Sequence, residues 1–155
     1  MAIFEWCKGS VPNGIKIKQV YGILFTQEGE MLVAIDRGHY TLVGGKPEPQ
    51  DDDLEATLKR EIYEKVNISV GESYIVGYQL VDDENGEEPY AQVRMTAVIE
   101  RMENITPDPA SGRIFDRILT KPCNAITLLA WGRVGEQQIN DAMVIASQKW
   151  GIVFD

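Results

Sequence analysis

Residues 44–68 read GGKPEPQDDDLEATLKREIYEKVNI and contain two glycines, an acidic loop and a helical pattern in succession. In the second half, apolar residues recur at every fourth position, the stripe of an amphipathic helix: Leu54, Leu58, Ile62 and Val66. Asp52, with Glu55 three residues later, has the spacing of a capping box at a helix start. Asn67 tolerates the left-handed conformation that ends a helix. The segment therefore predicts a glycine loop, an acidic turn and a helix between Asp52 and Asn67.

The charged face of this predicted helix carries two glutamates. Glu61 and Glu64 are three residues apart, so they project from the same side, away from the apolar stripe. Hard cations such as Mg²⁺ take oxygen ligands and commonly use one or two carboxylates together with substrate phosphates. Lys65 follows, where a third carboxylate would complete the cluster. The pattern fits either a modified metal site or an ordinary solvated helix face with i,i+4 ion pairs.

The whole segment resembles the Nudix box, the signature of the Nudix (MutT-like) hydrolases. That signature is Gly-x5-Glu-x7-Arg-Glu-U-x-Glu-Glu-x-Gly-U, where U is a bulky aliphatic residue. The glycine pair, an acid soon after it, the Arg-Glu-U triplet, the next glutamate and the last aliphatic residue are matched. The matching residues are Gly44, Gly45, Glu48, Arg60, Glu61, Ile62, Glu64 and Ile68.

The segment also departs from the signature. Six residues rather than five separate Gly45 from Asp52, which stands in place of the first glutamate when counted back from Arg60. Lys65 replaces the second glutamate of the Glu-Glu pair, and Asn67 replaces the glycine. In the family, the residue at the position of Lys65 is a principal metal ligand, and an ammonium group cannot coordinate Mg²⁺. The resemblance is therefore to a degenerate Nudix box.

The resemblance implies an α/β fold of the Nudix type, formed by one domain over residues 1–155. This fold is an α/β/α sandwich, in which a mixed β-sheet is flanked by the box helix and a C-terminal helix. The implied activity is hydrolysis of a diphosphate linkage in a nucleoside diphosphate linked to another moiety, with Mg²⁺ or Mn²⁺ as cofactor. The implied partner is a nucleotide-like small molecule, and the family and general symmetry preferences make a homodimer possible.

The resemblance also assigns roles to residues. Glu61 is the implied general base or a metal ligand, and Arg60 orients a glutamate through a charge-assisted hydrogen bond. The implied metal ligands are the carbonyl of Gly44 and the carboxylates of Glu61, Glu64 and Asp52. The candidates for substrate binding are Gly45, Lys65, which could point at a phosphate, and Arg94. A downstream carboxylate, Glu136 or Asp116, is a further candidate ligand.

Other readings of these residues stay open. Arg94 lies on an expected strand, where a solvated strand face is the simpler interpretation. An aromatic ring could stack on a base, but composition does not choose among Trp6, Trp131, Trp150, Tyr21 and Tyr40. Lys65 leaves room for a second function, a nucleotide-binding or regulatory module that holds its ligand without turnover. A third is a fold kept only as a scaffold for protein interactions.

The rest of the chain predicts strands and a second helix. Alternating or apolar-rich runs indicate strands within residues 15–25, 30–37, 39–45, 73–83 and 90–102. Helical spacing covers residues 136–150, whereas residues 124–132 fit a strand or a short helix. The first dozen residues and residues 105–116 are expected to be irregular. This order predicts a mixed sheet covered by helices.

Composition limits the classes of function. The chain has 155 residues, 44% of them hydrophobic and 25% charged, which is typical of a globular domain. A net charge of −9 disfavours binding to a nucleic acid polymer. No apolar run long enough to span a membrane and no secretory signal is evident. Two cysteines, Cys7 and Cys123, form no disulfide framework, so a cytoplasmic location is expected.

Overall fold

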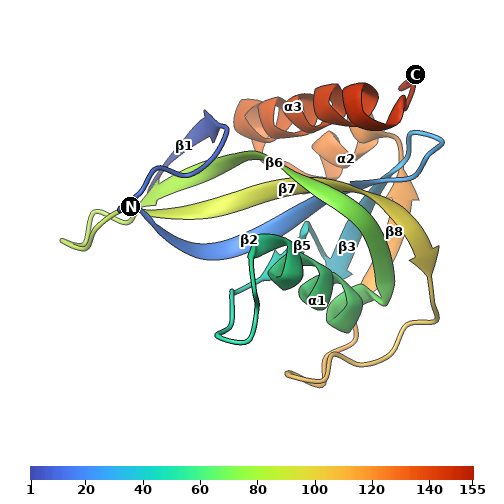
Figure 1. Cartoon of the computed structure of the whole chain (residues 1–155), viewed down its shortest axis with the longest axis horizontal. Coiled ribbons are helices and arrows are strands. Elements are labelled where there is room, and N and C mark those ends of the chain that lie inside the picture. The colour runs from blue at the N-terminus through green and yellow to red at the C-terminus, as the bar shows by residue number, and fades with distance from the viewer.

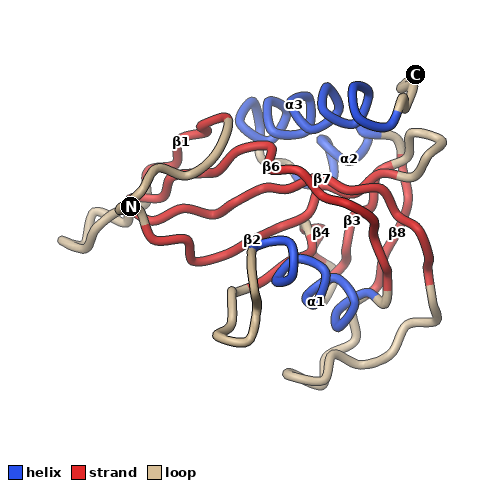
Figure 2. The backbone as a smooth tube through the Cα atoms, viewed as in Figure 1, coloured by secondary structure: helices blue, strands red, loops and turns tan.

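The computed structural model describes residues 1–155, and its centre is one mixed sheet of eight strands (Figure 1). The strands are β1 (Ile3–Lys8), β2 (Lys16–Phe25), β3 (Met31–Asp36), β4 (His39–Thr41), β5 (Val43–Gly45), β6 (Ile68–Asp82), β7 (Tyr90–Met102) and β8 (Asp116–Thr120). Helix α1 (Leu54–Val66) covers one face of the sheet. The other face carries α2 (Pro122–Leu129) and α3 (Gly132–Trp150), as Figure 2 shows. The predicted α/β/α sandwich, a mixed sheet flanked by the box helix and a C-terminal helix, is confirmed.

The strand order in the sheet is β1-β6-β7-β2-β3-β4, with β5 also paired to β2 and β8 to β3. Only β2 and β7 run parallel, and all other pairs are antiparallel. Strand β2 thus pairs with β7 on one side and with β5, the strand that ends in the glycine pair, on the other. The glycines are therefore fixed at the middle of the sheet.

Two hydrophobic cores form because successive side chains of a strand point to opposite faces. On β2, Val20 and Leu24 face the core beneath α1, and Ile23 and Phe25 face the core beneath α2 and α3. All four side chains are fully buried. Burial of this kind stabilises by about 25 cal/mol per Å² of apolar surface, so the two cores hold both helical layers against the sheet.

Helix α1 forms as predicted, with one correction at its start. The side chain of Asp53, not Asp52, caps the helix by accepting a hydrogen bond of 2.8 Å from the Ala56 amide. Glu55 does not turn back to the cap, because its carboxylate accepts two hydrogen bonds from Ser73 on β6. Asn67 ends the helix in the left-handed conformation with φ of 54°, as expected.

Several other predictions are corrected by the structure. The first dozen residues are only partly irregular, since Ile3–Lys8 form β1, which pairs with β6 along its whole length. The predicted strand over residues 39–45 is two strands, because β4 pairs with β3 while β5 pairs with β2. The undecided residues 124–132 belong largely to α2, where Pro122 takes the first turn that its fixed φ favours. None of the helices is both long and apolar enough to cross a membrane.

Candidate active site

The arginine of the box, Arg60, is anchored on an acid of the preceding loop. Its Nε and Nη2 donate hydrogen bonds of 3.0 and 2.8 Å to the two carboxylate oxygens of Asp51. Asp51 Oδ2 also accepts from the Thr57 hydroxyl at 2.8 Å and from the Glu48 amide at 2.9 Å. The hydrogen bond from Arg60, followed by that from the Glu48 amide, holds the pKa of Asp51 far below its usual range. This pair fixes the guanidinium beside the helix.

Asp51 therefore takes the place that residue counting gave to Asp52. Five residues, 46–50, separate Gly45 from Asp51, so the loop of the box keeps its usual length. The extra residue lies after Asp51, where the chain turns into the helix. The side chain of Asp52 is exposed and makes no hydrogen bond or ion pair, and its role as a metal ligand stays a prediction. Because three aspartates follow each other, the sequence alone does not show whether the extra residue lies before or after the acid that matches the signature.

Glu61 is an enclosed carboxylate, with its side chain only 11% exposed. It is buried, and its Oε1 accepts a hydrogen bond of 2.7 Å from Arg60 Nη1. Its Oε2 lies against Gly45, where a β-carbon would come within 2.1 Å of that oxygen. At Gly44, a β-carbon would meet the carbonyl oxygen of Val20 on β2 at 2.0 Å. The two glycines are thus needed for different reasons: Gly44 lets β5 pair closely with β2, and Gly45 leaves room for the carboxylate.

Lys65 points into the same place. Its Nζ donates a hydrogen bond of 2.5 Å to the carbonyl oxygen of Gly44 and lies 3.1 Å from Glu61 Oε2. The ammonium group therefore joins two of the oxygens that the resemblance assigns to a metal ion. Glu64 also approaches Arg60, since its Oε2 lies 3.5 Å from the Nη1 that contacts Glu61. The structure thus brings together Gly44, Gly45, Arg60, Glu61, Glu64 and Lys65.

These residues offer a metal ion only part of a coordination shell. No group of three or more His, Cys, Asp or Glu side chains lies close enough to hold a metal by itself. Glu61 and Glu64 supply two carboxylates linked through one arginine nitrogen, while the Gly44 carbonyl is engaged by Lys65. Hard oxygen donors of this number fit Mg²⁺ when substrate phosphates and water complete its shell. A metal cage closed by protein alone does not fit.

A small cavity of about 170 Å³ opens beside Lys65. Arg113, from the loop before β8, lines it and donates a hydrogen bond of 2.9 Å to Asp36 on β3. The Arg113 guanidinium also lies 5.1 Å from the ring centre of Phe115. Lys65 and Arg113 give this cavity two cationic side chains against the one carboxylate of Asp36, and this excess of positive charge suits phosphate groups. Sequence reasoning missed both Arg113 and Asp36, because nothing local marks either residue.

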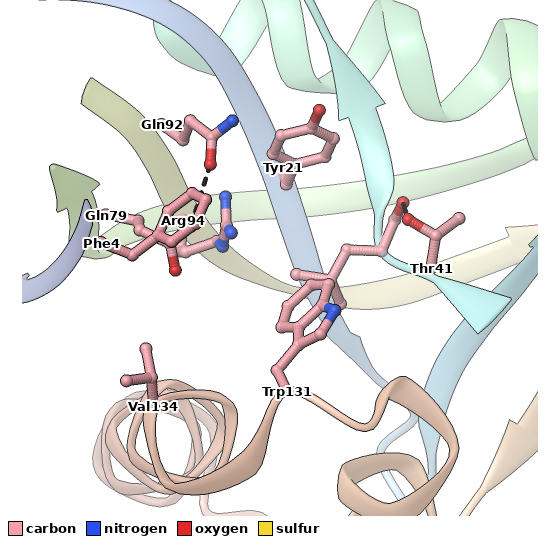
Figure 3. Close-up of a pocket in the computed structure, with 9 residues that line it drawn as sticks. Phe4, Tyr21, Thr41, Gln79, Gln92, Arg94, Trp131 and Val134 are labelled. Carbon is pink, nitrogen blue, oxygen red and sulfur yellow. Dashed lines mark hydrogen bonds between the residues drawn. The ribbon is translucent and has the colours of Figure 1, made fainter. Parts of the chain in front are cut away.

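A larger cavity of about 420 Å³ adjoins the small one (Figure 3). Both share Tyr21, Thr41 and Leu42 in their walls. The other lining residues of the larger cavity are Phe4, Gln79, Gln92, Arg94, Trp131 and Val134. Of the aromatic candidates, Tyr21 and Trp131 reach this cavity, whereas Trp6, Trp150 and Tyr40 do not. Neither Glu136 nor Asp116 lines either cavity, and both are exposed.

Arg94 does not lie on a solvated strand face. Its residue is only 3% exposed, and its guanidinium carbon lies 5.0 Å from the ring centre of Tyr21 and 5.5 Å from that of Trp131. Burial lowers the pKa of Arg94 to about 10, and no carboxylate is paired with it. The simpler interpretation, that Arg94 lies on a solvated strand face, is therefore wrong, because α3 and the Trp131 side chain cover this part of β7. Contact between Arg94 and a substrate stays a prediction.

Comparison with known proteins extends these observations. The family model described as NUDIX domain matches residues 16–121. A solved structure of the pyrophosphohydrolase BsRppH of Bacillus subtilis is similar, with 19% sequence identity and a TM-score of 0.70. The match covers 97% of this chain and 93% of that chain. No protein of curated function matches the sequence significantly.

Two further solved structures show the range of this fold. An Ap4A hydrolase of C. elegans is 14% identical with a TM-score of 0.54, covering 84% of this chain and 98% of that chain. NrtR of Shewanella oneidensis, solved with a 27mer DNA, is 20% identical with a TM-score of 0.59. The latter match covers 85% of this chain and 63% of that chain. At these identities, the likeness establishes a shared fold.

Proposed function

The chain belongs to the Nudix family of pyrophosphohydrolases, and from this premise we propose that it hydrolyses a diphosphate linkage in a nucleoside diphosphate linked to another moiety. One observation carries the proposal. A buried carboxylate, Glu61, is held by Arg60 and Lys65, and that lysine also lines a cavity of suitable size for phosphate. A carboxylate fixed in this way can accept a proton from water that attacks a bound phosphate group.

The two acids of α1 would hold the divalent cation, Mg²⁺ or Mn²⁺. Glu61 and Glu64 are its proposed ligands, and the substrate's phosphates would complete its shell. Such an ion supplies positive charge to the diphosphate when bound. Asp52 is exposed and its side chain makes no hydrogen bond or ion pair to these residues, so the proposal does not depend on it as a ligand. A carboxylate has about four lone-pair sites, so the ion pairs of Glu61 do not exhaust its oxygens.

The basic residues would orient the substrate and support the carboxylates. Arg60 fixes Glu61 and is itself fixed by Asp51, so it acts through positioning. Lys65 supplies a permanent positive charge at the Gly44 carbonyl, where the family signature has a carboxylate. Together with Arg113, it would attract the diphosphate into the small cavity. The proposed site thus uses fixed cations of the chain beside a bound metal.

Hydrolysis of a substrate panel tests the proposal. Nucleoside triphosphates, ADP-ribose, sugar nucleotides and dinucleoside polyphosphates would be incubated with the protein and Mg²⁺ or Mn²⁺. We expect turnover of at least one class, reduced by about 100-fold or more in Glu61→Gln because a proton acceptor is lost. Glu28→Gln is the matched control, since Glu28 is exposed and distant from the site. Absence of turnover with either metal, or full activity in Glu61→Gln, contradicts the proposal.

A further inference from the structure

Side chains of the larger cavity, together with Gln138, form a chain of hydrogen bonds in which each side chain donates to the next. Arg94 Nε donates 2.9 Å to Gln138 Oε1, and an arginine side chain has donors only. The amide of Gln138 is thereby oriented, so its Nε2 donates to Gln79 Oε1 at 3.1 Å. Gln79 Nε2 in turn donates to Gln92 Oε1 at 3.1 Å (Figure 3). Because the first group cannot accept, the orientation of all three amides follows from it.

This network leaves donors on two lining residues of the cavity, Arg94 and Gln92, without a protein acceptor. Arg94 Nη1 is buried and has no hydrogen-bond partner. Gln92 Nε2 is the free end of the network, since its Oε1 accepts from Gln79. No carboxylate lines the cavity. Buried donors are rarely left unsatisfied, so a ligand of this cavity is expected to present acceptors to the Arg94 guanidinium, and the Gln92 amide offers a second donor in the same wall.

The walls of the cavity suit a flat aromatic ring. Five of its nine lining residues are hydrophobic, and they include Phe4 and Trp131, which are 52% and 38% exposed. Figure 3 shows the rings of Phe4, Tyr21 and Trp131 around the Arg94 guanidinium. Exposed aromatic rings stack on bases at low cost in conformational entropy. The phosphate-binding character, in contrast, lies in the adjoining small cavity with Lys65 and Arg113.

We propose that the larger cavity binds the base of a 6-oxopurine nucleotide in preference to a 6-aminopurine nucleotide. The N7 and O6 atoms of guanine are neighbouring acceptors, whereas adenine presents an acceptor at N7 and a donor at its amino group. The donors of the Arg94 guanidinium and of the Gln92 amide match the first pattern and oppose the second. The inference rests on the proposed function only in taking the substrate to be a nucleotide.

Binding of two matched ligands tests this preference without hydrolysis. Titration calorimetry would measure the affinity of the protein for IMP and for AMP in the absence of divalent metal. These ligands share ribose and phosphate and differ only at the 6-position and its neighbouring ring nitrogen. We expect IMP to bind about tenfold more tightly or better, as for a well-placed pair of base contacts. Equal affinities, tighter binding of AMP, or no binding of IMP at millimolar concentration would overturn the proposal.

A polarity change at the free end of the network sharpens the test. Gln92→Glu replaces the donor Nε2 by an oxygen and keeps an acceptor for Gln79. We expect this variant to lose the preference for IMP by about tenfold, partly through tighter binding of AMP. Gln137→Glu is the control, because Gln137 is exposed on α3 and adds the same charge outside the cavity. An unchanged IMP-to-AMP ratio in Gln92→Glu, in a folded protein, would also overturn the proposal.

The two proposals of function fail separately. The monophosphates have no diphosphate linkage, so their binding does not depend on catalysis. A preference for IMP without turnover of any diphosphate would support the base site and contradict the proposed hydrolysis. Turnover by a protein that binds IMP and AMP equally would contradict only the base site. Inorganic phosphate that displaces IMP equally well in native protein and in Gln92→Glu, with no base preference, would show that Arg94 binds an anion instead.

Discussion

Two cationic side chains that line adjoining cavities, Lys65 and Arg94, differ in how the fold surrounds them. Lys65 is partly exposed, yet its ammonium has both a carbonyl and a carboxylate as partners. Arg94 is almost completely buried, yet one of its nitrogens has no partner at all. A charge that is already neutralised shapes the oxygens around it, whereas a buried charge with a free donor is available to a ligand. The site around Lys65, here called the organised end, is thus held by partners within the chain before a ligand binds. The cavity around Arg94, here called the open end, keeps a donor that only a ligand can satisfy.

The largest expected effect comes from disturbing the organised end at Gly45. Gly45→Ala places a methyl group where the Glu61 carboxylate lies, which separates Glu61 from Lys65. Displacement of a catalytic group by about 1 Å can lower activity by about 100-fold, and we expect a loss of at least that size in kcat. Steady-state kinetics with the best substrate of the panel measures it.

Gly71→Ala is the matched control for that prediction. Gly71 also lies on a strand and has no positive φ, and a β-carbon there would meet only the carboxylate of Glu100. Its activity is expected to stay near that of the native protein. Similar losses in both variants would mean that Gly45 acts through the strand rather than through Glu61.

Removal of the exposed ring of Trp131 tests the role of the open end. Trp131→Ala is expected to weaken IMP binding by about tenfold, the usual contribution of one stacked base. Because Trp131 is 38% exposed and the rest of its ring packs on the chain, the free energy of unfolding should fall by about 1–3 kcal/mol. Calorimetric titration and urea denaturation give the two quantities. Trp150→Phe, outside the cavity, should leave IMP affinity unchanged, and a loss of affinity there would contradict the assignment.

Replacement of Lys65 by glutamate restores the residue that the family signature has at this position. Lys65→Glu adds a carboxylate beside Glu61 and frees the Gly44 carbonyl. The Mg²⁺ concentration that gives half-maximal activity should therefore fall by about tenfold, since more oxygen ligands and more negative charge bind the ion more tightly. Lys59→Glu, on the same helix but paired with Glu55, controls for net charge. An unchanged metal requirement in Lys65→Glu would contradict this role of Lys65.

The smallest effect concerns the acid that anchors Arg60. The pKa of Asp51 is depressed in the folded protein. The ionised Asp51 side chain therefore stabilises the folded state at pH values above about 3.9, the pKa of an aspartate in the unfolded chain. This contribution is lost as the pH falls toward the folded pKa. The difference in unfolding free energy between native protein and Asp51→Asn should be constant above about pH 5 and shrink below about pH 4.

Asp52→Asn serves as the comparison for Asp51→Asn, because the two residues are adjacent and only one contacts Arg60. Its unfolding free energy should follow that of the native protein at every pH. Denaturant titrations between about pH 3 and pH 7 cover the range in which the two variants should separate. Identical behaviour of both variants would contradict a stabilising contact between Asp51 and Arg60.

The organised end could be predicted from the sequence in most respects, because it is made of residues close in the chain. The stripe from Leu54 to Val66, the glycine pair and the left-handed Asn67 are local patterns, and the structure has them as expected. The choice between Asp51 and Asp52 failed because counting residues does not reveal on which side of an acid a loop has grown. Only the hydrogen bonds of Arg60 decide it.

The open end could not be predicted, because its residues come from distant parts of the chain. Arg94 and Gln138 are 44 positions apart, and Gln79 and Gln138 are 59 apart. The direction of their hydrogen bonds depends on contacts among β6, β7 and α3. The periodicity of a single helix or strand carries no information about such contacts. For the same reason β1 was missed: its residues are largely exposed, and its pairing is provided by β6.

The one-way network of amides also bears on how a lineage of such proteins could change its ligand. A glutamine amide can exchange its oxygen and nitrogen by turning, with no change in shape. The group at position 94 therefore decides what Gln92 presents, although Gln138 and Gln79 lie between them. One mutation that put an acceptor at position 94 would reverse all three amides and present an oxygen to the base. Descendants could thus acquire the opposite preference while every glutamine stayed the same.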